Sequence, residues 1–467
     1  MEMTPAPESL RAFHLLAKPS GAACNLDCKY CFFLSKEALY PGSRFRMPDK
    51  LLEIYIRQLL ESKPGSEVTV AWQGGEPTLM GLDFFKRSVA FVEMYRQPGQ
   101  NISYTLQTNG TRIDGEWAAF FKEHNFLIGL SLDGTKAMHD AYRLDKGGQG
   151  SFDQVMRGWR ALLQKEVDFN ILCTLHAANA DYPLEVYRYF RDELGAQFVQ
   201  FIPIVERATP ATLPIANQGW SASPGGDRPL YLQAGDQVTE RSIKPEQYGR
   251  FLMAVFDEWV RRDVGKVFVQ MFDVALGSWM GAYTLCVFAP TCGNALVLEH
   301  NGDMYSCDHF VEPNFLLGNI QETHLAELAV SHKQTRFGQA KQDALPKVCQ
   351  ECAVRFACNG GCPKDRFNRT PDGEPGLNYL CEGYKLFFKH IDRPVRMMAD
   401  FLGRGYAAAE VMNILAMEEL TRLQQAMAAT RPDDACPCGS GKKFRVCHAR
   451  SEKNRSTAVN RGNRKRS

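Results

Sequence analysis

Three cysteines lie within eight residues near the start of the chain, at Cys24, Cys28 and Cys31. The C-x₃-C-x₂-C spacing lets three thiolates surround one corner of a cubane, so we expect this run to bind a [4Fe–4S] cluster. Clusters held by protein alone usually take four cysteines, and three leave one iron with an open position where a second cofactor can bind. The alternatives are three buried thiols, or a zinc site completed by His14, although zinc sites tend to use paired C-x₂-C.

Eight more cysteines lie between residues 286 and 381, namely Cys286, Cys292, Cys307, Cys349, Cys352, Cys358, Cys362 and Cys381. Eight thiolates suffice for two fully ligated four-cysteine clusters. The run C-x₂-C-x₅-C-x₃-C at 349–362 contains Gly360 and Gly361, which permit tight wrapping. Two zinc ribbons are the competing interpretation. A ribbon uses two C-x₂-C pairs, and this region lacks such a double pair.

A third cysteine group, C-x-C-x₈-C-H, comprises Cys436, Cys438, Cys447 and His448. Three sulfurs and one imidazole form a closed tetrahedral zinc site, so we expect one zinc ion here. Cys173 is left over, and we expect it to be a buried apolar residue.

Composition places these sites in an ordinary globular chain with 45% hydrophobic and 23% charged residues. No window approaches the ~20 apolar residues of a membrane span, and residues 1–13 lack the pattern of a signal peptide. We therefore expect a cytoplasmic protein that does not enter membranes. Fifteen cysteines in a cytosolic chain favour metal binding over disulfides.

The net charge of +2 is unevenly distributed. Residues 441–467 carry ten Lys/Arg against Glu452 alone, a charge of +9, which leaves −7 for residues 1–440. Such a tail could touch nucleic acid or an acidic partner. A solvated, disordered end is the commoner case, so we do not expect nucleic-acid binding.

Strand and helix patterns alternate from residue 10 to about 205. The candidate strands are 13–18, 68–73, 102–107, 126–132, 169–175 and 198–204, and the candidate helices are 49–62, 83–96, 115–124, 151–165 and 182–194. Asp49 and Ser151 are candidate N-caps. Six such repeats predict an α/β fold with a parallel sheet and right-handed crossovers. Six units are fewer than a closed barrel needs, so we expect an open, partial (β/α)6 barrel.

Polar loops follow several of these strands: Gly74–Pro77 (GGEP), Gln107–Gly110 (QTNG), Ser131–Gly134 (SLDG) and then Arg143. Each loop alone is first of all a turn. Because the carboxyl ends of parallel strands share one edge, together they predict a binding site there.

With these motifs in this order, residues 10–205 resemble the radical S-adenosylmethionine (SAM) superfamily. The resemblance implies that Cys24, Cys28 and Cys31 hold a cluster whose open iron chelates SAM, and that reduction yields methionine and a 5′-deoxyadenosyl radical. It also implies contacts from the backbone of Gly74, Gly75, Glu76 and Pro77 to the SAM amino group, and from Ser131, Arg143 and Asn109 to the rest of SAM.

The second cysteine field resembles the SPASM extension of radical SAM enzymes, and most closely that of the anaerobic sulfatase-maturating enzymes. The resemblance implies two interleaved auxiliary [4Fe–4S] clusters. Cys286, Cys292, Cys307 and Cys362 would hold one, and Cys349, Cys352, Cys358 and Cys381 the other. It further implies that Asp308, next to Cys307, is the general base, with His309 as the fallback. Phe33 departs from the family, in which several members have tyrosine.

Residues 436–448 resemble the SEC-C motif, which is usually a protein-binding knuckle. We therefore expect a radical SAM domain at 1–240, including a Pro/Gly/Ser-rich loop at 206–240, and a SPASM domain at 241–395 that begins with a helix at 245–262. A helical linker at 396–430, a zinc motif at 431–450 and a basic, disordered tail at 451–467 would follow.

The resemblance implies oxidation of a cysteine or serine to Cα-formylglycine in an unfolded sulfatase segment of the type C/S-x-P/A-x-R. It implies SAM, three [4Fe–4S] clusters, and a reduced flavodoxin or ferredoxin as electron donor; we add one zinc and expect a monomer. A SPASM maturase that forms thioether or carbon–carbon crosslinks in a ribosomal peptide is the alternative enzyme. Such enzymes often carry a leader-binding domain, and we see no β-rich segment in the residues printed before Cys24, which counts against this alternative. A non-catalytic electron carrier or zinc-tethered adaptor is the third hypothesis, which the intact SAM loops disfavour.

Overall fold

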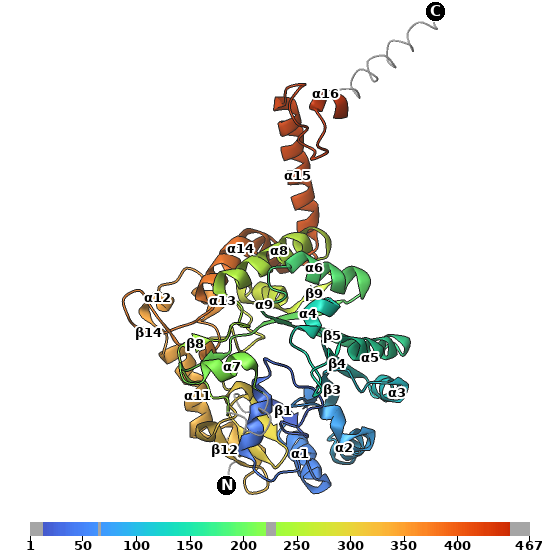
Figure 1. Cartoon of the computed structure of the whole chain (residues 1–467), viewed down its shortest axis with the longest axis vertical. Helices are drawn as coiled ribbons and strands as arrows, with labels where there is room; N and C mark the ends of the chain where they lie inside the picture. Colours follow the sequence, from blue (N-terminus) through green and yellow to red (C-terminus); the bar gives the residue numbers. More distant parts are fainter. Residues whose placement is uncertain (1–12, 64–66, 221–229, 449–467) are drawn as a thin grey trace, which may run out of the picture. The chain divides into compact units, whose positions relative to one another are not determined.

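The computed structural model describes residues 13–63, 67–220 and 230–448 (Figure 1). Its main sheet has ten strands, and six of them are parallel neighbours in chain order. These six are β1 (His14–Lys18), β2 (Glu67–Trp72), β3 (Asn101–Thr108), β4 (Phe126–Ser131), β5 (Phe169–Leu175) and β6 (Phe198–Pro203). All six predicted strands are therefore confirmed, with ends that differ by at most one residue.

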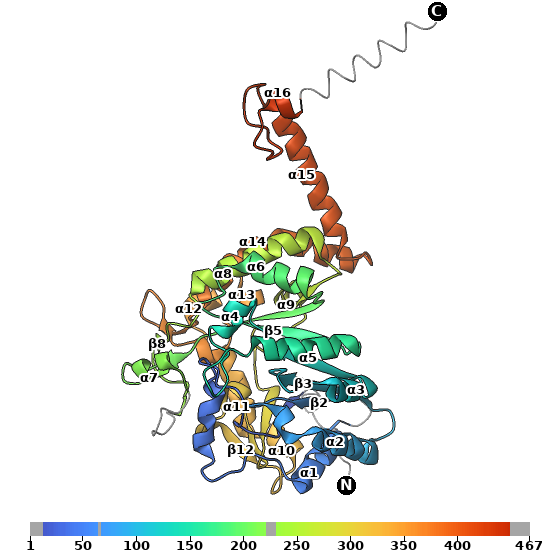
Figure 2. The ribbon, with the colours of Figure 1, turned by 45° about the vertical axis from the view of Figure 1, so that its right-hand side comes forward.

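Helices connect these strands, as the alternating pattern predicts. They are α1 (Asp49–Glu61), α2 (Leu82–Tyr95), α3 (Gly115–Glu123), α4 (Lys136–Asp140), α5 (Phe152–Gln164) and α6 (Pro183–Arg188), the last continuing as a π-helical turn over Tyr189–Glu193. Figure 2 shows α1, α2, α3 and α5 along one side of the sheet. The open β/α arrangement is thus confirmed.

The two predicted N-caps differ in outcome. Asp49 is the first residue of α1, and the N-cap is Pro48, whose ψ of 153° is extended. The Asp49 carboxylate instead accepts a hydrogen bond from Arg87 Nε at 3.1 Å, so the prediction for Asp49 is wrong. Ser151 does occupy the N-cap of α5, but its hydroxyl donates to the carbonyl oxygen of Arg143 at 2.8 Å.

The first strand has two different faces, because side chains alternate along a strand. Leu15 and Ala17 belong to the large core beneath α1 and α2, and both are almost fully buried. Leu16 belongs to a smaller cluster on the opposite face, together with Phe33 and other residues. By alternation, Lys18 lies on the same face as Leu16, which is the face of the candidate site.

The cysteine-rich region adds strands that the sequence did not predict. β10 (Ala295–Glu299) pairs in parallel with β1, and β11 (Asp303–Tyr305) and β12 (Leu316–Asn319) continue the sheet as antiparallel strands. At the other edge, β9 (Phe268–Val269) lies beside β6. The segment that carries Cys307 is therefore built onto the same sheet as the cluster loop near Cys24.

Residues 206–240, predicted as a long loop, contain structure of their own. β7 (Arg207–Ala208) pairs with β8 (Gln237–Val238), and α7 (Leu213–Gln218) lies between them in the chain. Ala208, Ala216, Trp220 and Tyr231 form a small buried cluster here. Glu206 joins the two ends, since its carboxylate accepts hydrogen bonds from Trp220 Nε1 at 2.6 Å and from Arg241 at 3.0 Å.

Further short elements complete the cysteine-rich region. They are α9 (Gln270–Trp279), α10 (Leu325–Ala329), α11 (His332–Asp343), α12 (Lys347–Gln350), α13 (Arg355–Cys358), β13 (Asn368–Arg369) and β14 (Pro375–Leu377). The predicted helix at 245–262 is α8 (Pro245–Arg262). The helical residues expected at 396–430 lie in α14 (Cys381–Gly403) and α15 (Glu410–Ala429).

The chain forms two compact units. One comprises residues 1–257 and 266–396, so the barrel and the cysteine-rich region share it, and the other comprises residues 258–265 and 397–467. The second unit contains α15 and the short helix α16 (Phe444–Cys447). The features expected of residues 1–12 and of the basic tail at 451–467 lie outside the described residues. Among the described residues, no helix is both long and apolar enough to cross a bilayer.

Candidate active site

The loop that carries Cys24, Cys28 and Cys31 follows β1 and is held by backbone hydrogen bonds. The Asp27 and Lys29 N–H groups donate to carbonyl oxygens of residues 144 and 142, at 2.8 and 2.9 Å. Cys28 is buried, and Cys24 and Cys31 are half-buried. The loop therefore has a fixed backbone around its three thiols.

The sulfur of Cys24 receives two N–H donors, Leu26 N at 3.4 Å and Asn109 Nδ2 at 3.7 Å. Burial raises the pKa of the Cys24 thiol to about 12, and it also raises the pKa values of Cys28 and Cys31. A free thiol here would stay protonated, whereas N–H donors aimed at a sulfur suit a thiolate bound to metal. The donor set therefore fits a cluster.

The GGEP loop after β2 packs directly on the cluster loop. Gly75 N–H donates to Gly21 O at 2.8 Å, and Glu76 N–H donates to Ala23 O at 2.9 Å. A Cβ on Gly75 would come within 2.0 Å of Ala23 O, and Gly74 has a φ of +130°. Only glycine permits this approach. Because an ammonium group can only donate hydrogen bonds, the carbonyl oxygens of this loop are the groups that could bind one.

Glu76 joins this loop to the next one. Its buried carboxylate accepts hydrogen bonds from Thr78 N, Thr78 Oγ1, Thr108 Oγ1 and Asn109 N, all at 2.6–3.0 Å. Burial raises the pKa of Glu76, and these four hydrogen bonds oppose that rise. The Glu76 side chain thus holds the GGEP and QTNG loops together. Asn109 extends the connection, since its Nδ2 also donates to Asn25 at 2.9 Å.

Asp133, in the SLDG loop, binds several side chains and one backbone N–H group around the candidate site. Its carboxylate accepts hydrogen bonds from Arg143 Nε at 2.8 Å, Arg143 Nη2 at 3.1 Å, Tyr30 Oη at 2.5 Å and Thr174 N at 2.9 Å. Although burial opposes it, the Arg143 guanidinium holds the pKa of Asp133 well below its usual range. Because Tyr30 lies between Cys28 and Cys31, Asp133 also ties the cluster loop to the ends of β4 and β5.

Arg143 is 8% exposed, and Ser131, the last residue of β4, is 6% exposed. Within the described residues, the hydrogen bonds of the Arg143 side chain use Nε and Nη2. Nη1 is therefore the guanidinium nitrogen available for a ligand. Arg143 was recognised in the sequence, but Asp133 and Tyr30, which orient it, were not. The aspartate within the SLDG loop was the feature that could have indicated this ion pair.

Asp308, the predicted base, starts a 3₁₀ turn directly after Cys307. The ammonium of Lys18 contacts Asp308 Oδ1 and lies 3.2 Å from the centroid of the Phe33 ring. Although burial opposes it, Lys18 lowers the pKa of Asp308. Burial lowers the pKa of His309 to about 4, so its imidazole is neutral. Lys18 was not singled out from the sequence, because Asp308 lies 290 residues further along the chain.

The eight cysteines between residues 286 and 381 fall into two neighbourhoods. Burial raises the pKa of Cys307, and the thiolates of Cys362 and Cys286 raise it further. Cys286 has the same effect on Cys292. Burial likewise raises the pKa of Cys358 to about 12, with further rises caused by its neighbours Cys381, Cys349 and Cys352. These neighbourhoods are compatible with the two interleaved ligand sets that the resemblance implies, which stay a prediction.

Two cations, the buried Lys341 and the half-buried Arg366, lie beside these thiols. Lys341, 1% exposed, donates to the carbonyl oxygens of Cys286 at 2.6 Å and Val287 at 2.9 Å, and also to that of Ala289. Arg366 donates only to carbonyl oxygens, among them that of Gly360 at 2.9 Å. In the described part of the chain neither contacts a carboxylate. A buried charge needs a counter-charge, and four thiolates around a [4Fe–4S] core supply one.

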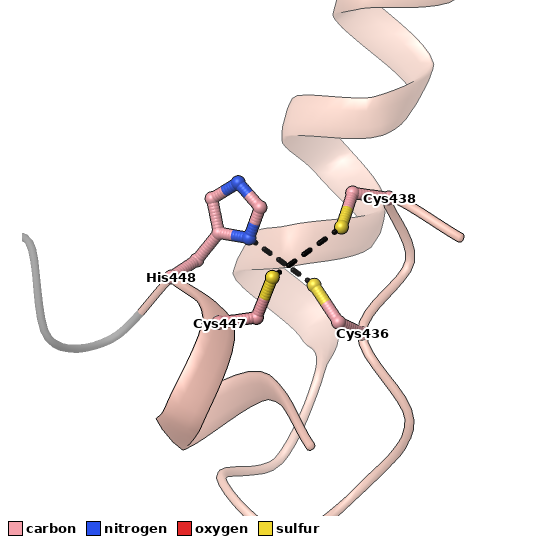
Figure 3. Close-up of side chains that lie close together, drawn as sticks. All are labelled: Cys436, Cys438, Cys447 and His448. Atoms are coloured by element: carbon pink, nitrogen blue, oxygen red, sulfur yellow. Dashed lines mark hydrogen bonds between the residues drawn. The ribbon is translucent and has the colours of Figure 1, made fainter. Parts of the chain in front are cut away.

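In the second unit, the ligand atoms of Cys436, Cys438, Cys447 and His448 lie within 4.8 Å of one another and point toward one centre (Figure 3). Cys436 Sγ is 3.2 Å from His448 Nδ1, and Cys438 Sγ is 3.6 Å from Cys447 Sγ. A hydrogen bond from Ser440 is the main reason that the pKa of Cys438 is lowered to about 6, which favours a thiolate. Three sulfurs and one nitrogen at this spacing fit a closed zinc site.

Comparisons with protein families match three segments of the chain. Residues 19–190 match the radical SAM superfamily, residues 286–353 match an iron–sulfur cluster-binding domain, SPASM, and residues 434–450 match the SEC-C motif. The first and third matches each cover a whole cysteine group, whereas the SPASM match covers the second group only as far as Cys352.

The match to this chain covers nearly the whole length of two curated relatives. A serine-type anaerobic sulfatase-maturating enzyme of Bacteroides thetaiotaomicron is 41% identical over 89% of this chain and 98% of its own. A cysteine-type anaerobic sulfatase-maturating enzyme of Clostridium perfringens is 33% identical over 80% of this chain and 95% of its own.

Among solved structures, native anSMEcpe with bound AdoMet and Cp18Cys peptide has a TM-score of 0.71 and 32% identity, covering 83% of this chain and 99% of that one. SuiB of Streptococcus suis bound to its precursor peptide SuiA has a TM-score of 0.53 and 16% identity, over 80% of this chain and 76% of that one, which shows likeness of fold alone.

Proposed function

This chain belongs to the anaerobic sulfatase-maturating enzymes of the radical SAM superfamily, and we propose that it oxidises a cysteine or serine of an unfolded sulfatase segment to Cα-formylglycine. It is an enzyme whose family acts on a side chain of another protein. The alternative of a peptide-crosslinking maturase is not favoured, since the relatives that match most of the chain are sulfatase-maturating enzymes.

One observation carries this proposal: the ion pair between Lys18 and Asp308. Lys18 ends the strand that leads into the cluster loop, and Asp308 follows Cys307 in the cysteine-rich region. The pair therefore brings a carboxylate from one half of the compact unit beside the SAM-side loops of the other half. An oxidation that removes both a hydrogen atom and a proton from one substrate residue needs such a juxtaposition.

SAM and the clusters, when bound, supply a 5′-deoxyadenosyl radical that removes a hydrogen atom and an acceptor for one electron. The residues proposed to hold the SAM-side cluster are Cys24, Cys28 and Cys31. Carbonyl oxygens of Gly74 to Pro77 are suited to the ammonium group of SAM, because they accept hydrogen bonds and an ammonium group donates them. Arg143 Nη1 would bind the SAM carboxylate, and Ser131 and Asn109 would line the same pocket.

Asp308 is the proposed general base. The ion pair with Lys18 keeps the carboxylate ionised and ready to accept a proton. The proton becomes easier to remove once the neighbouring carbon has lost its hydrogen atom, so a carboxylate with a lowered pKa is still an adequate base. His309 is neutral and next in the chain, and it is the alternative acceptor.

We assign Cys286, Cys292, Cys307 and Cys362 to one auxiliary [4Fe–4S] cluster, Cys349, Cys352, Cys358 and Cys381 to the other, and Cys436, Cys438, Cys447 and His448 to one zinc ion. A reduced flavodoxin or ferredoxin would donate the electron that starts the reaction. The protein would act as a cytoplasmic monomer.

The direct test is to incubate the anaerobically reconstituted protein with SAM, a reductant and two peptides of about twenty residues that differ only in Cys or Ser at the target position. Formylglycine is measured by mass spectrometry after trapping of the aldehyde with a hydrazide. Formation of the aldehyde in either peptide supports the proposal. Deoxyadenosine formation without aldehyde in either peptide would reject sulfatase maturation.

A further inference from the structure

We propose that Lys18 is a positioning residue, which sets the place of the Asp308 carboxylate relative to the SAM-binding loops and so couples hydrogen abstraction to proton removal. This inference depends on the proposed function, in which Asp308 is the base. Three observations support it: the contacts of the Lys18 side chain, the contacts of the Lys18 backbone, and the fact that Lys36, the other buried lysine nearby, is bound to a carbonyl oxygen.

The Lys18 side chain is 2% exposed and is aimed at the candidate site. Alternation along β1 puts it on the same face as Leu16, and parallel pairing places it opposite Glu299 of β10. Burying an ammonium group is costly unless it gains an ion-pair or hydrogen-bond partner. The carboxylate that Lys18 contacts is Asp308, and the Phe33 ring lies against the ammonium at 3.2 Å.

The Lys18 backbone belongs to the SAM side of the site. Its carbonyl oxygen accepts a hydrogen bond from Gly21 N–H at 3.0 Å, in the turn that leads to Cys24. A Cβ built on Gly74 would lie 3.2 Å from Lys18 Cβ and 3.4 Å from Lys18 Cα. One residue therefore touches the GGEP loop with its backbone and the base with its side chain.

The second buried lysine of this region cannot substitute for Lys18. Lys36 Nζ donates to the carbonyl oxygen of Tyr231 at 2.6 Å, and its nearest carboxylate is Glu312 at 3.8 Å. The position of Asp308 therefore depends on Lys18.

The substrate residue would lose a hydrogen atom, an electron and a proton. Bound SAM would supply the radical that takes the hydrogen atom, an auxiliary cluster would accept the electron, and Asp308 would take the proton of the hydroxyl or thiol. Lys18 contacts Oδ1, so Oδ2 is the oxygen that would take the proton. The product is the aldehyde from serine, or a thioaldehyde from cysteine that water converts to the aldehyde with release of hydrogen sulfide.

The test uses the full, reconstituted enzyme and measures deoxyadenosine formed per formylglycine. In K18M the loss of the ammonium should raise this ratio by about 10- to 100-fold, a part of the 10²–10⁴-fold that a general base supplies. Iron content and SAM affinity should stay at wild-type values. K18R, which keeps a cation, should return the ratio to within about threefold of wild type.

Lys63 offers a matched control. It is also buried, its ammonium lies 4.9 Å from the centroid of the Phe13 ring, and it donates to Phe13 O at 2.6 Å, just before β1 begins. K63M makes the same chemical change far from Asp308, so its ratio should be that of the wild type. An equal rise in K63M and K18M would show a general packing effect and reject the positioning role.

The double variant K18M/D308N separates this inference from the proposed function. If Lys18 acts through Asp308, the double variant should have the ratio of D308N alone. A wild-type ratio in D308N would reject Asp308 as base, whatever K18M does. A raised ratio in D308N with a wild-type ratio in K18M would reject only the role of Lys18. Loss of iron in both K18M and K18Q would also reject it, because Lys18 would then be needed for folding.

Discussion

Arg143 and Asp133 form a two-pronged ion pair, with Nε 2.8 Å from Oδ2 and Nη2 3.1 Å from Oδ1. Both groups are buried, and the pair leaves one end of the guanidinium, Nη1, for a ligand. A planar cation that binds a structural carboxylate on one edge can present its other edge to a substrate carboxylate in a fixed direction. The first test follows from this geometry.

Arg143→Lys should weaken SAM binding by about tenfold or more, because one ammonium cannot satisfy Asp133 and the SAM carboxylate together. Iron content should not change, since Arg143 is not a cluster ligand. The measurement is equilibrium binding of SAM to the reconstituted protein. Wild-type affinity in this variant would remove Arg143 from the SAM site.

Metal content tests the assignment of fourteen of the fifteen cysteines to metal sites. The reconstituted protein should hold about 12 iron and about 12 sulfide, three clusters in all, together with about one zinc. Replacing Cys24, Cys28 and Cys31 by Ala should leave about 8 iron while SAM cleavage is lost. A wild-type protein with only about 4 iron and several zinc ions would show that residues 286–381 form a zinc domain.

Asp308→Asn keeps the size of the side chain but removes its basicity. Formylglycine formation should fall by about 10²–10⁴-fold, while deoxyadenosine continues to form because SAM binds elsewhere. Chromatography of both products from one reaction gives the ratio. An unchanged ratio at normal turnover would transfer the role of base to His309 or to water.

Lys341→Met should make the auxiliary cluster next to Cys286 harder to reduce, because a buried positive charge that stabilises the reduced state is lost. Lys341→Arg is the matched control, and it should keep the potential near that of the wild type. The measurement is a redox titration followed by electron paramagnetic resonance. Equal potentials in the methionine variant and the wild type would show that Lys341 only fastens the loop at residues 286–289.

Removal of residues 431–467 should leave peptide oxidation nearly unchanged, because a Cys₃His site is closed and has no open position for catalysis. Recruitment of a full-length sulfatase should weaken, and its salt dependence should fall if the basic residues contribute. The comparison is between turnover of a short peptide and of the whole sulfatase. Loss of peptide turnover would assign the knuckle to the active enzyme itself.

Local patterns in the sequence were enough for the six parallel strands and the helices between them, because each is a regular apolar repeat. β10, β11 and β12 could not be predicted in this way. They are three to five residues long and interspersed among cysteines. β10 pairs with β1, which lies 281 residues earlier (295 − 14), and β11 and β12 are then added onto β10. Asp49 was misplaced by one position for a local reason, the extended conformation of Pro48.

The cysteine spacing was a strong signal for the metal sites, because a metal dictates the identity and separation of its ligands. The residues that support them gave no such signal. Lys18, Tyr30 and Lys341 resemble any lysine or tyrosine until the fold brings them beside Asp308, Asp133 and Cys286. Contacts between residues far apart in the sequence depend on tertiary structure and have no local pattern.

The parallel pairing of β1 with β10 constrains the order in which this protein can fold. Until residue 299 has left the ribosome, β1 is an edge strand whose outer N–H and C=O groups are unpaired, and such edges invite association with other chains. The loop at Cys24 is synthesised early, yet the strand that precedes it, β1, gains its neighbour β10 only much later. Long-range pairing of this kind is slow. The nascent barrel must therefore remain soluble during most of translation, until β10 pairs with β1 beside the first cluster loop.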